Sequence, residues 1–374
     1  MESNDSSADS CYYHIFSSAE IWITSIAYVI IIIASVIGNC LVTWVVYSSP
    51  LMRTPSHYFI VNMAVADLLI TVFGMPVAAR EQIINTDAID FGGIRGEIYC
   101  KMLEYTKDVS ISCSILTLVA IATDRFCATL IPFKRLITLF KAKVMMVLIW
   151  IVSLVVTIPL LVVANVIEYE NNKFFCYEDW TVFHDLGASE MEHSYTIALF
   201  IILYAAPLVI ISILYGAVIR KIWKREIPGQ PTRSGRQMQQ RSKKKVLKIF
   251  MTVVVCFMAC WLPYHVILFT YNFDCYPPIN LWFFARFLGH TNSSITPWIY
   301  IIYGRDYRLG AKRILKKVSS KPDPLPLFYN RSVQIPSPDI NSSNLNNVTL
   351  KTFKIIYKLN NDKIEIVKLW EKAV

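Results

Sequence analysis

The sequence predicts an all-α integral membrane protein: a seven-transmembrane helix bundle followed by a short amphipathic eighth helix. The chain has 374 residues, of which 55% are hydrophobic and 17% are charged, whereas soluble domains carry about 25% charged residues. The mean hydropathy is +0.44. Long apolar stretches alternate with short polar ones, so the net charge of +10 indicates basic loops rather than a nucleic-acid-binding domain.

The predicted spans are mainly apolar stretches of about 20 residues or more, each long enough to cross about 30 Å of hydrocarbon. A chain inside lipid must satisfy its own backbone hydrogen bonds, so we expect helices rather than isolated strands. The spans are approximately 21–47, 58–82, 98–124, 143–165, 195–219, 246–270 and 281–303.

Basic residues give the orientation of the bundle. Lys and Arg crowd the connection between the fifth and sixth spans and the segment after the seventh, whereas the first 20 residues contain neither. Because cytoplasmic loops carry the excess of Lys and Arg, we expect an extracellular N-terminus and a cytoplasmic C-terminus in the plasma membrane. No cleavable signal peptide is evident, so the first span would serve as the insertion signal.

The predicted domain organisation has four parts. Residues 1–20 form the extracellular N-terminus and residues 21–303 the transmembrane domain. Apolar and basic residues are interleaved over 304–317, which predicts an amphipathic helix on the inner membrane surface. Residues 318–374 form a cytoplasmic tail that we expect to be largely disordered, since its first part is rich in Ser, Asn and Pro.

Four of the cysteines lie on the extracellular side of this topology, where pairing is expected. Cys100 begins the third span and Cys176 lies within the long loop that follows the fourth, so a bond between them would pin that loop over the bundle. Cys11 and Cys275 remain as a candidate second bridge, which would tie the N-terminus to the last outer loop. The alternative is that these two are free thiols.

Every span also carries a short motif, and the order and spacing of these motifs resemble the rhodopsin-like (class A) G-protein-coupled receptors over residues 21–316. Among these receptors the chain resembles those for neuropeptides, of the RFamide and neuropeptide Y type. The motifs are Gly38-Asn39, Asn62-Met-Ala-Val-Ala-Asp67-Leu68, Cys100 with Asp124-Arg125-Phe126, Trp150 with Pro159, Pro207 with Tyr215, Phe257-Met-Ala-Cys260-Trp261-Leu-Pro263, and Thr296-Pro297-Trp-Ile-Tyr300.

The resemblance implies a cytoplasmic switch that activates heterotrimeric G proteins. Asp124 would neutralise Arg125 at rest, and outward movement of the sixth helix would free Arg125 for the G protein. Taken alone, Arg125 would be a snorkelling residue. The sequence departs from the family at Phe126, which replaces Tyr, and at Lys243, where some receptors carry a Glu partner for Arg125. The implied switch residues are Asp124, Arg125, Tyr215, Thr296, Pro297 and Tyr300.

A transmission core between ligand and switch is also implied. Prolines inside membrane helices remove hydrogen bonds and create kinks about which a helix can swing. The implied core consists of Ile115, Pro207, Phe257, Trp261 and Pro263.

Asp67 is a carboxylate with no basic partner in its own span, so it is either protonated or faces a cation. The resemblance places it with Ser114, Asn292 and Ser293 around a sodium ion, whose preferred ligands are oxygens. Thr296 replaces the usual Asn or Asp, which removes one strong ligand. We expect no other cofactor.

The candidate ligand residues favour a peptide. Lys107 stands where amine receptors carry Asp, and His290 where opsins carry the retinal lysine, so neither ligand class fits. The acidic outer surface would attract a basic peptide; Glu104 and Asp108 suit an Arg side chain, and Lys107 and Arg286 suit a carboxylate or an amide carbonyl, unless these charges pair with one another. The candidate set is Glu81, Glu104, Lys107, Asp108, Trp261, Tyr264, His265, Arg286 and His290.

Alternatives remain at this stage. A lipid or other non-peptide ligand, or an orphan receptor with high basal activity, would use the same fold, and a transporter or channel would be a different class. The sequence contains no enzyme-like constellation and no internal repeat. We expect receptor kinase, arrestin and the lipid bilayer as further partners and no nucleic acid, and Asn4 is the plausible glycosylation site.

Overall fold

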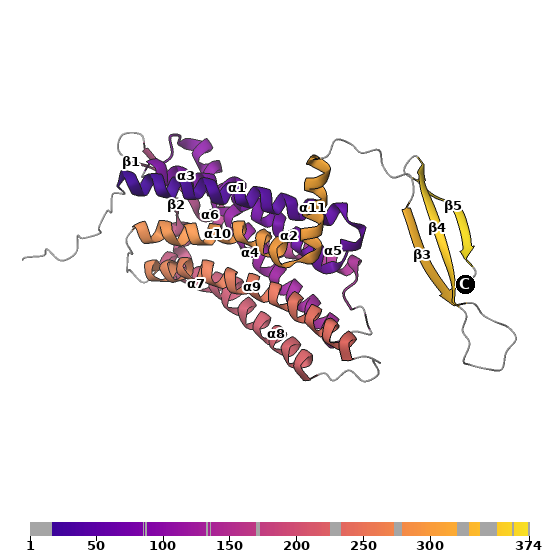
Figure 1. Ribbon diagram of the computed structural model, residues 1–374. Coiled ribbons are helices and arrows are strands. Elements are labelled where there is room, and N and C mark those ends of the chain that lie inside the picture. The colour runs from indigo at the N-terminus through magenta and orange to yellow at the C-terminus, as the bar shows by residue number, and fades with distance from the viewer. Residues whose placement is uncertain are drawn as a thin grey trace, which may run out of the picture. The chain divides into compact units, whose positions relative to one another are not determined.

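In the described part of the main unit, Met1–Lys312, seven helical segments run alongside one another (Figure 1). The computed structural model describes residues 17–84, 86, 88–131, 134, 136–169, 173–224, 233–272, 279–319, 329–336, 350–360 and 363–372. The segments are α1 (Ser18–Ser48), α2 with η2 and α3 (Pro55–Leu69, Ile70–Gly74, Met75–Ile84), α4 (Gly93–Leu130), α5 and α6 (Leu139–Val156, Ile158–Val163), α7 with η5 and α8 (Ala188–Phe200, Ile201–Ala205, Ala206–Lys224), α9 (Arg233–Asn272) and α10 (Ile279–Tyr303).

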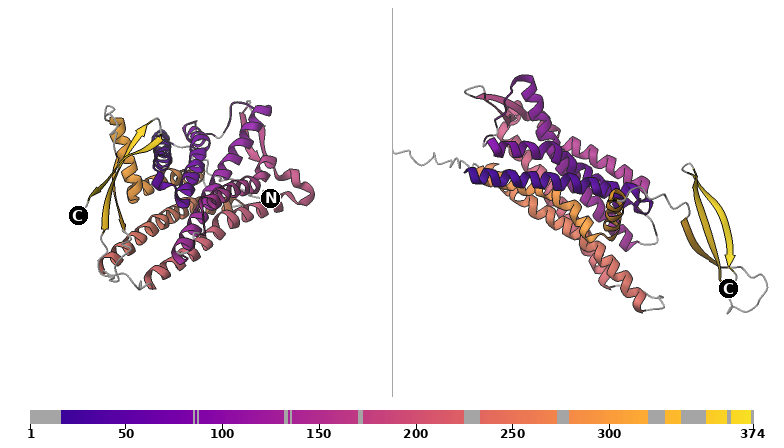
Figure 2. Two further views of the ribbon diagram at one scale, coloured as in Figure 1. Left: turned by 90° about the vertical axis from the view of Figure 1, so that its right-hand side faces the viewer. Right: turned by 45° about the horizontal axis from the view of Figure 1, so that its top comes forward.

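These segments confirm the seven predicted spans. Among the described residues, six helices are long and apolar enough to cross a membrane. The remaining segment, α10, has 25 residues, a length of about 37 Å at 1.5 Å per residue, and its apolar character is diluted by polar groups such as Arg286 and His290. The central helix is α4, which packs against α2, α5 and α8; Figure 2 shows the bundle from two further directions.

Two of the helical segments contain a wider, π-type turn next to a proline. The turn η2 (Ile70–Gly74) precedes Pro76, and η5 (Ile201–Ala205) precedes Pro207. Proline has no N–H to offer the preceding turn, and an extra residue in the turn accommodates the missing hydrogen bond without breaking the helix. Pro207 is thus placed at an irregularity of the helix, as the sequence predicts for a bending point.

The fourth span ends earlier than its predicted boundary of 165. Its helix is interrupted at Thr157, just before Pro159, and ends at Val163. Ala164 already begins the strand β1 (Ala164–Tyr169), which pairs antiparallel with β2 (Lys173–Glu178) in a hairpin. Asn165, Val166 and Ile167 place branched and turn-forming side chains here, so the chain leaves the helix as a strand.

A short 3-10 segment, η4 (Trp180–Leu186), connects the hairpin to α7. The Asp179 carboxylate accepts hydrogen bonds from the backbone N–H of Thr181 at 3.1 Å and from its hydroxyl at 2.5 Å, as a helix-capping residue does. The bonds from Thr181 lower the pKa of Asp179. This cap fixes the direction in which the chain leaves the hairpin.

The eighth helix, α11 (Arg305–Ser319), begins directly after Gly304. Tyr307 and Ala311 are buried, and the Tyr307 ring lies 6.0 Å from that of Tyr300 and 5.7 Å from that of His57. A Cβ at Gly310 would come within 2.4 Å of Val45, so the absence of a side chain lets α11 approach α1. The predicted amphipathic helix is present, with its apolar side against the bundle.

The residues from Arg313 onward belong to a second unit, which differs from the disorder expected for the tail. Its described strands β3 (Tyr329–Pro336), β4 (Leu350–Asn360) and β5 (Lys363–Lys372) form an antiparallel sheet in the order β3-β4-β5. Alternating apolar and charged residues along 350–372 suit paired strands. Residues 320–328 and 337–349 lie outside the described residues.

Candidate functional site

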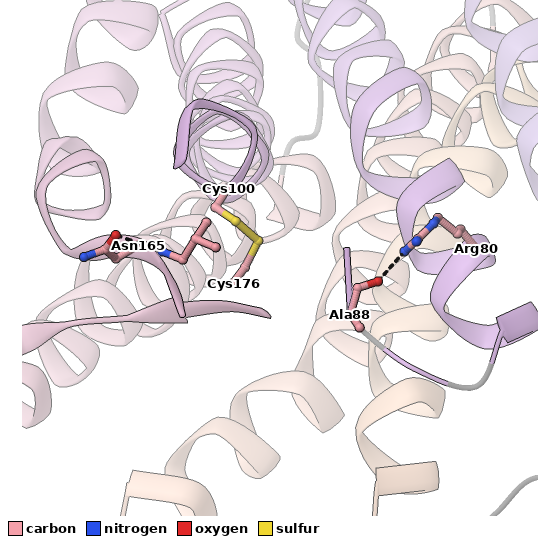
Figure 3. The surroundings of a disulfide bond; sticks show 6 residues. Arg80, Ala88, Cys100, Asn165 and Cys176 are labelled. Carbon is pink, nitrogen blue, oxygen red and sulfur yellow. Dashed lines mark hydrogen bonds between the residues drawn. A yellow bond between two sulfur atoms is a disulfide. The ribbon is translucent and has the colours of Figure 1, made fainter. Parts of the chain in front are cut away.

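The hairpin covers one end of the bundle and is fastened there by a disulfide. Cys100 of α4 and Cys176 of β2 are bonded, with their Cα atoms 5.6 Å apart (Figure 3). Ile89 exchanges backbone hydrogen bonds with Phe174, at 2.7 and 3.4 Å, and Arg80 donates to the Ala88 carbonyl at 2.8 Å. The predicted bond is therefore present, while Cys11 and Cys275 lie outside the described residues.

A cavity of about 140 Å³ lies beneath the hairpin. Three of the predicted ligand residues, Glu81, Glu104 and Arg286, line it. The other lining residues are Val77, Arg80, Ile89, Tyr99, Leu103, Cys176, Trp282 and Phe283.

The charges predicted to meet a ligand are partly engaged with one another. Lys107 forms an ion pair with Glu104 one turn away on α4, and Arg286 of α10 pairs with Glu81 of α3. The Arg286 guanidinium also lies over the Phe283 ring, 5.1 Å from its centroid. The alternative that these charges pair with one another therefore holds for these four residues. Asp108 differs: among the described residues it has no hydrogen-bond or ion-pair partner.

Glu178 is a further carboxylate here, and the sequence analysis did not select it. Its Oε2 accepts a hydrogen bond of 3.0 Å from Trp180 Nε1. Burial and the neighbouring Glu104 carboxylate raise the pKa of Glu178 to about 7. The signal that could have identified it is its position two residues after Cys176, which places both side chains on one face of a strand.

Aromatic residues form the floor below the charges. The Trp261 ring lies 5.7 Å from that of Tyr264 and 6.2 Å from that of Phe257. A Cβ at Gly289 would come within 3.0 Å of the Trp261 ring, so α10 has a glycine where the indole packs. This stack joins the predicted ligand residues on α9 to the predicted transmission core.

The two histidines of the predicted set lie on separate helices. His265 packs between Tyr204 and Phe200, with ring centroids 4.5 and 5.4 Å away. The buried His290 has its Nδ1 3.5 Å from the Tyr28 hydroxyl of α1. Both are enclosed by neighbouring helices, so a contact with ligand would require those neighbours to move.

Polar groups cluster around Asp67 in the middle of the bundle. Ser293 donates to Asp67 Oδ1 at 2.8 Å and Ser114 donates to the same oxygen at 3.4 Å. Asp67 Oδ2 and Asn292 Oδ1 are buried without a hydrogen-bond partner in the described part of the chain. The predicted residues are brought together, and two oxygens are left with capacity to bind a cation. The Thr296 hydroxyl bonds instead to the Asn292 carbonyl at 2.9 Å.

Motif residues on α1 and α10 contact one another. A Cβ at Gly38 would lie 2.6 Å from the Pro297 ring, so only glycine lets α1 approach the proline so closely. Asn39 Nδ2 donates to the Ser293 carbonyl at 3.1 Å. This carbonyl lies one turn before Pro297, which lacks the N–H that would otherwise bond to it.

At the opposite end of α4, Arg125 forms an ion pair with Asp124. The hydroxyl of Ser56, on α2, bonds to both side chains, and the Arg125 guanidinium lies 5.7 Å from the centroid of the Phe250 ring of α9. The predicted neutralisation of Arg125 by Asp124 is thus present. Ser56 is an additional partner that the sequence analysis did not identify.

The two predicted tyrosines stand near this cluster without bonding to it. Tyr215 and Tyr300 are both buried, and the Tyr300 ring lies 6.2 Å from that of Phe250. The Tyr300 hydroxyl has no hydrogen-bond partner among the described residues. The side chain of Lys243 lies outside the described residues.

The family model described as "7 transmembrane receptor (rhodopsin family)" matches residues 38–300. The chain belongs to the rhodopsin family. It is therefore a multi-pass membrane receptor of a family whose general activity is G-protein activation, and the predicted resemblance is confirmed.

The receptor is similar to several curated proteins named for different peptides. It is 30% identical to neuropeptide FF receptor 2 of Rattus norvegicus, over 85% of this chain and 78% of the relative. It is 31% identical to a QRFP-like peptide receptor of Branchiostoma floridae, over 66% and 63%. It is 30% identical to a substance-P receptor of Aquarana catesbeiana, over 79% and 71%.

Proposed function

We propose that this receptor binds an extracellular peptide at the plasma membrane and activates heterotrimeric G proteins through outward movement of α9. The observation that carries the proposal is the charged cavity beneath the disulfide-fastened hairpin, where carboxylates and cations from α3, α4 and α10 converge. Lipid ligands prefer largely apolar sites, whereas a peptide offers charged ends and amides that suit such groups. Relatives named for three different peptides support the ligand class but not one particular peptide.

Signal would pass from the cavity to the cytoplasm through the aromatic stack. A ligand pressing on Tyr264 and Trp261 would change the packing around Phe257, Ile115 and Pro207, and α9 would swing about Pro263. Because Phe250 of α9 lies against Arg125, that movement would uncover the guanidinium. Tyr215, Tyr300 and the segment around Thr296 and Pro297 would then rearrange with it.

The remaining parts of the proposal concern its surroundings. The extracellular N-terminus would carry a glycan at Asn4, and the cytoplasmic tail would meet receptor kinase and arrestin. Asp67, Ser114, Asn292 and Ser293 would hold a sodium ion, because two unpaired buried oxygens need a cation or a proton. The bilayer would contact the exposed apolar surfaces of α1 and α5.

The test is to express the chain and screen amidated and free peptides, reading cyclic-nucleotide and calcium signals. We expect at least one peptide class to evoke a signal that Arg125→Ala abolishes while peptide binding persists. Untransfected cells and the Thr252→Ala variant, at an exposed hydroxyl of α9, are the controls. Ion flux across the membrane together with silence towards every peptide would favour a transporter or channel instead.

A further inference from the structure

We infer that Glu178 of β2 and Asp108 of α4 together bind a guanidinium of the peptide ligand, whereas Glu104 does not. This inference rests on the proposed function and makes it more specific. The sequence alone suggested Glu104 and Asp108 as the acidic pair, and the structure replaces one of them.

The first step is the pairing of the extracellular cations. Lys107 is paired with Glu104, Arg286 with Glu81, Lys101 with Glu97 and Arg80 with Asp90. The extracellular residues that the structure does not describe contain no Lys or Arg. Arg95, which is exposed at the start of α4, forms no ion pair with Asp108 or Glu178 among the described residues. Asp108 and Glu178 therefore lie at the cavity end of the bundle without an ion-pair partner in the described part of the chain.

The second step is the geometry that brings the two acids together. Side chains alternate across a strand, and Cys176 points at α4 because it is bonded to Cys100. Glu178 lies on that same face of the strand, and its side chain, like that of Tyr177, is exposed at the surface. Asp108 lies just over two turns of α4 beyond Cys100, about 80° round the helix from it.

The neighbours of Glu178 confirm this placement. Its charge interacts with those of Glu104, Lys107 and Asp108. Tyr195 of α7 lies near both Asp108 and Glu178, and Tyr264 of α9 lies near the same group. The two acids thus share neighbours on α4, α7 and α9, where three carboxylates (Glu104, Asp108 and Glu178) interact with one lysine, Lys107.

The third step is the support of Glu178. Trp180 holds one carboxylate oxygen at 3.0 Å and is itself only 4% exposed, packed with Leu160 and Val163. Its ring lies 5.3 Å from that of Tyr195. The carboxylate is therefore positioned before ligand arrives, which lowers the cost of binding, and its other oxygen has no hydrogen-bond partner among the described residues.

Lys173 is the one basic residue of β2, and it does not neutralise Asp108 or Glu178. It is an odd-numbered residue of β2, so its side chain is on the opposite face from Cys176 and Glu178.

A guanidinium suits the site better than an ammonium, because its planar fork can donate to two carboxylates at once.

The test uses synthetic peptides ending in Arg-Phe-amide, with twins carrying citrulline or Lys in place of that Arg. Citrulline keeps the shape and removes the charge. We expect the citrulline twin to be about ten-fold weaker or more on the wild type. Glu178→Gln and Asp108→Asn should weaken the Arg peptide similarly and leave the twin unchanged, so that the ratio of the two potencies approaches one.

Matched controls are Glu168→Gln on β1 and Glu97→Gln on the outer end of α4, which should keep the full potency ratio. A ratio that stays at ten in Glu178→Gln would overturn the inference while leaving peptide recognition intact. If the Lys twin were as potent as the Arg peptide, the site would recognise the positive charge alone, which would overturn the assignment to a guanidinium.

A second measurement is independent of any peptide. A reporter cysteine, Tyr264→Cys, is reacted with cationic and anionic thiosulfonates, and labelling of the parent chain is subtracted. We expect the cationic reagent to react faster, and Glu178→Gln or Asp108→Asn to reduce that preference several-fold. No change would overturn the acidic pair. A clear preference with no peptide response at all would instead contradict the proposed function.

Discussion

The two ends of the bundle treat charge in opposite ways. At the end proposed to be cytoplasmic, Arg125 is enclosed by Asp124, Ser56 and the Phe250 ring, so the cation is satisfied inside the protein. At the end proposed to be extracellular, two ion pairs line or adjoin the cavity, yet Asp108 and Glu178 have no ion-pair partner among the described residues.

The difference matches the roles proposed for the two ends, a switch at one and a ligand-binding site at the other. A charge satisfied internally has to be released by a movement, which suits a switch. A charge without a partner inside the protein can pair with an oppositely charged ligand, which suits a binding site. The predictions below disturb one end at a time, from the largest expected effect to the smallest.

Breaking the disulfide should have the largest effect. In Cys176→Ser the hairpin loses its bond to α4, and with it the position of Glu178. We expect loss of most surface expression and peptide response, since removing a native disulfide costs about 2–5 kcal/mol. Expression is read by surface labelling, and Cys40→Ser, which changes an exposed free thiol, should behave as wild type.

Removing one partner of the ion pair between α3 and α10 should come next. In Glu81→Gln the Arg286 guanidinium remains largely buried with its charge uncompensated, which costs about 3 kcal/mol. Thermal unfolding of purified receptor should show this loss. The comparison is Asp90→Asn, which removes an 89% exposed carboxylate from its pair with Arg80, where about 0–1 kcal/mol is expected. Equal effects of the two would contradict the buried pair.

The potency of the Arg-Phe-amide peptide should depend on pH through Glu178. The pKa of its carboxyl is about 7, so about 90% is ionised at pH 8 and about 10% at pH 6. Because only the ionised form attracts a cation, potency should fall up to about nine-fold as the pH drops from 8 to 6.

The citrulline twin and Glu178→Gln should both give flat pH profiles. The other groups facing Glu178 are Glu104, Lys107, Asp108, Tyr195 and Tyr264. Asp108→Asn should flatten the profile as well, because it removes the charge recognition on which the pH dependence rests. A full dependence in Glu178→Gln would assign it to another of these groups.

At the cytoplasmic end, Ser56→Ala should raise basal signalling. It removes the hydroxyl that bonds to both Asp124 and Arg125, a loss of about 1 kcal/mol from the resting state, or roughly five-fold in its population. Basal cyclic-nucleotide and calcium levels at matched expression provide the measurement. Unchanged levels would mean that Ser56 does not hold Arg125 at rest. Thr54→Ala, which removes a neighbouring hydroxyl bonded to His57, is the control.

Much of the architecture was predictable because lipid leaves few alternatives. Seven apolar stretches had to be helices, and Lys and Arg indicated their direction. Motifs such as Gly38-Asn39 and Asp124-Arg125 then placed particular residues, and the structure shows the contacts that such residues make. Cys100 and Cys176 could be paired from topology, because a loop and a helix start on the same side can meet.

The ligand site was less predictable. Glu104, Lys107, Asp108, Glu81 and Arg286 could all be recognised as charges near the outer ends of helices. Pattern alone cannot tell whether such charges pair with one another or wait for a ligand, because that depends on distances between different helices. The sequence did not indicate the position of Glu178, because this residue lies in a loop whose strand pairing depends on the disulfide and on the bridge between Ile89 and Phe174.

The sequence by itself determined the bundle, the family and the Asp124–Arg125 pair, since hydrophobic length and motif order are local properties of the chain. Only the tertiary structure decided which charges are already neutralised. Coulomb energy depends on separation and burial, and residues such as Glu81 and Arg286, 205 positions apart, acquire both only when the helices have packed.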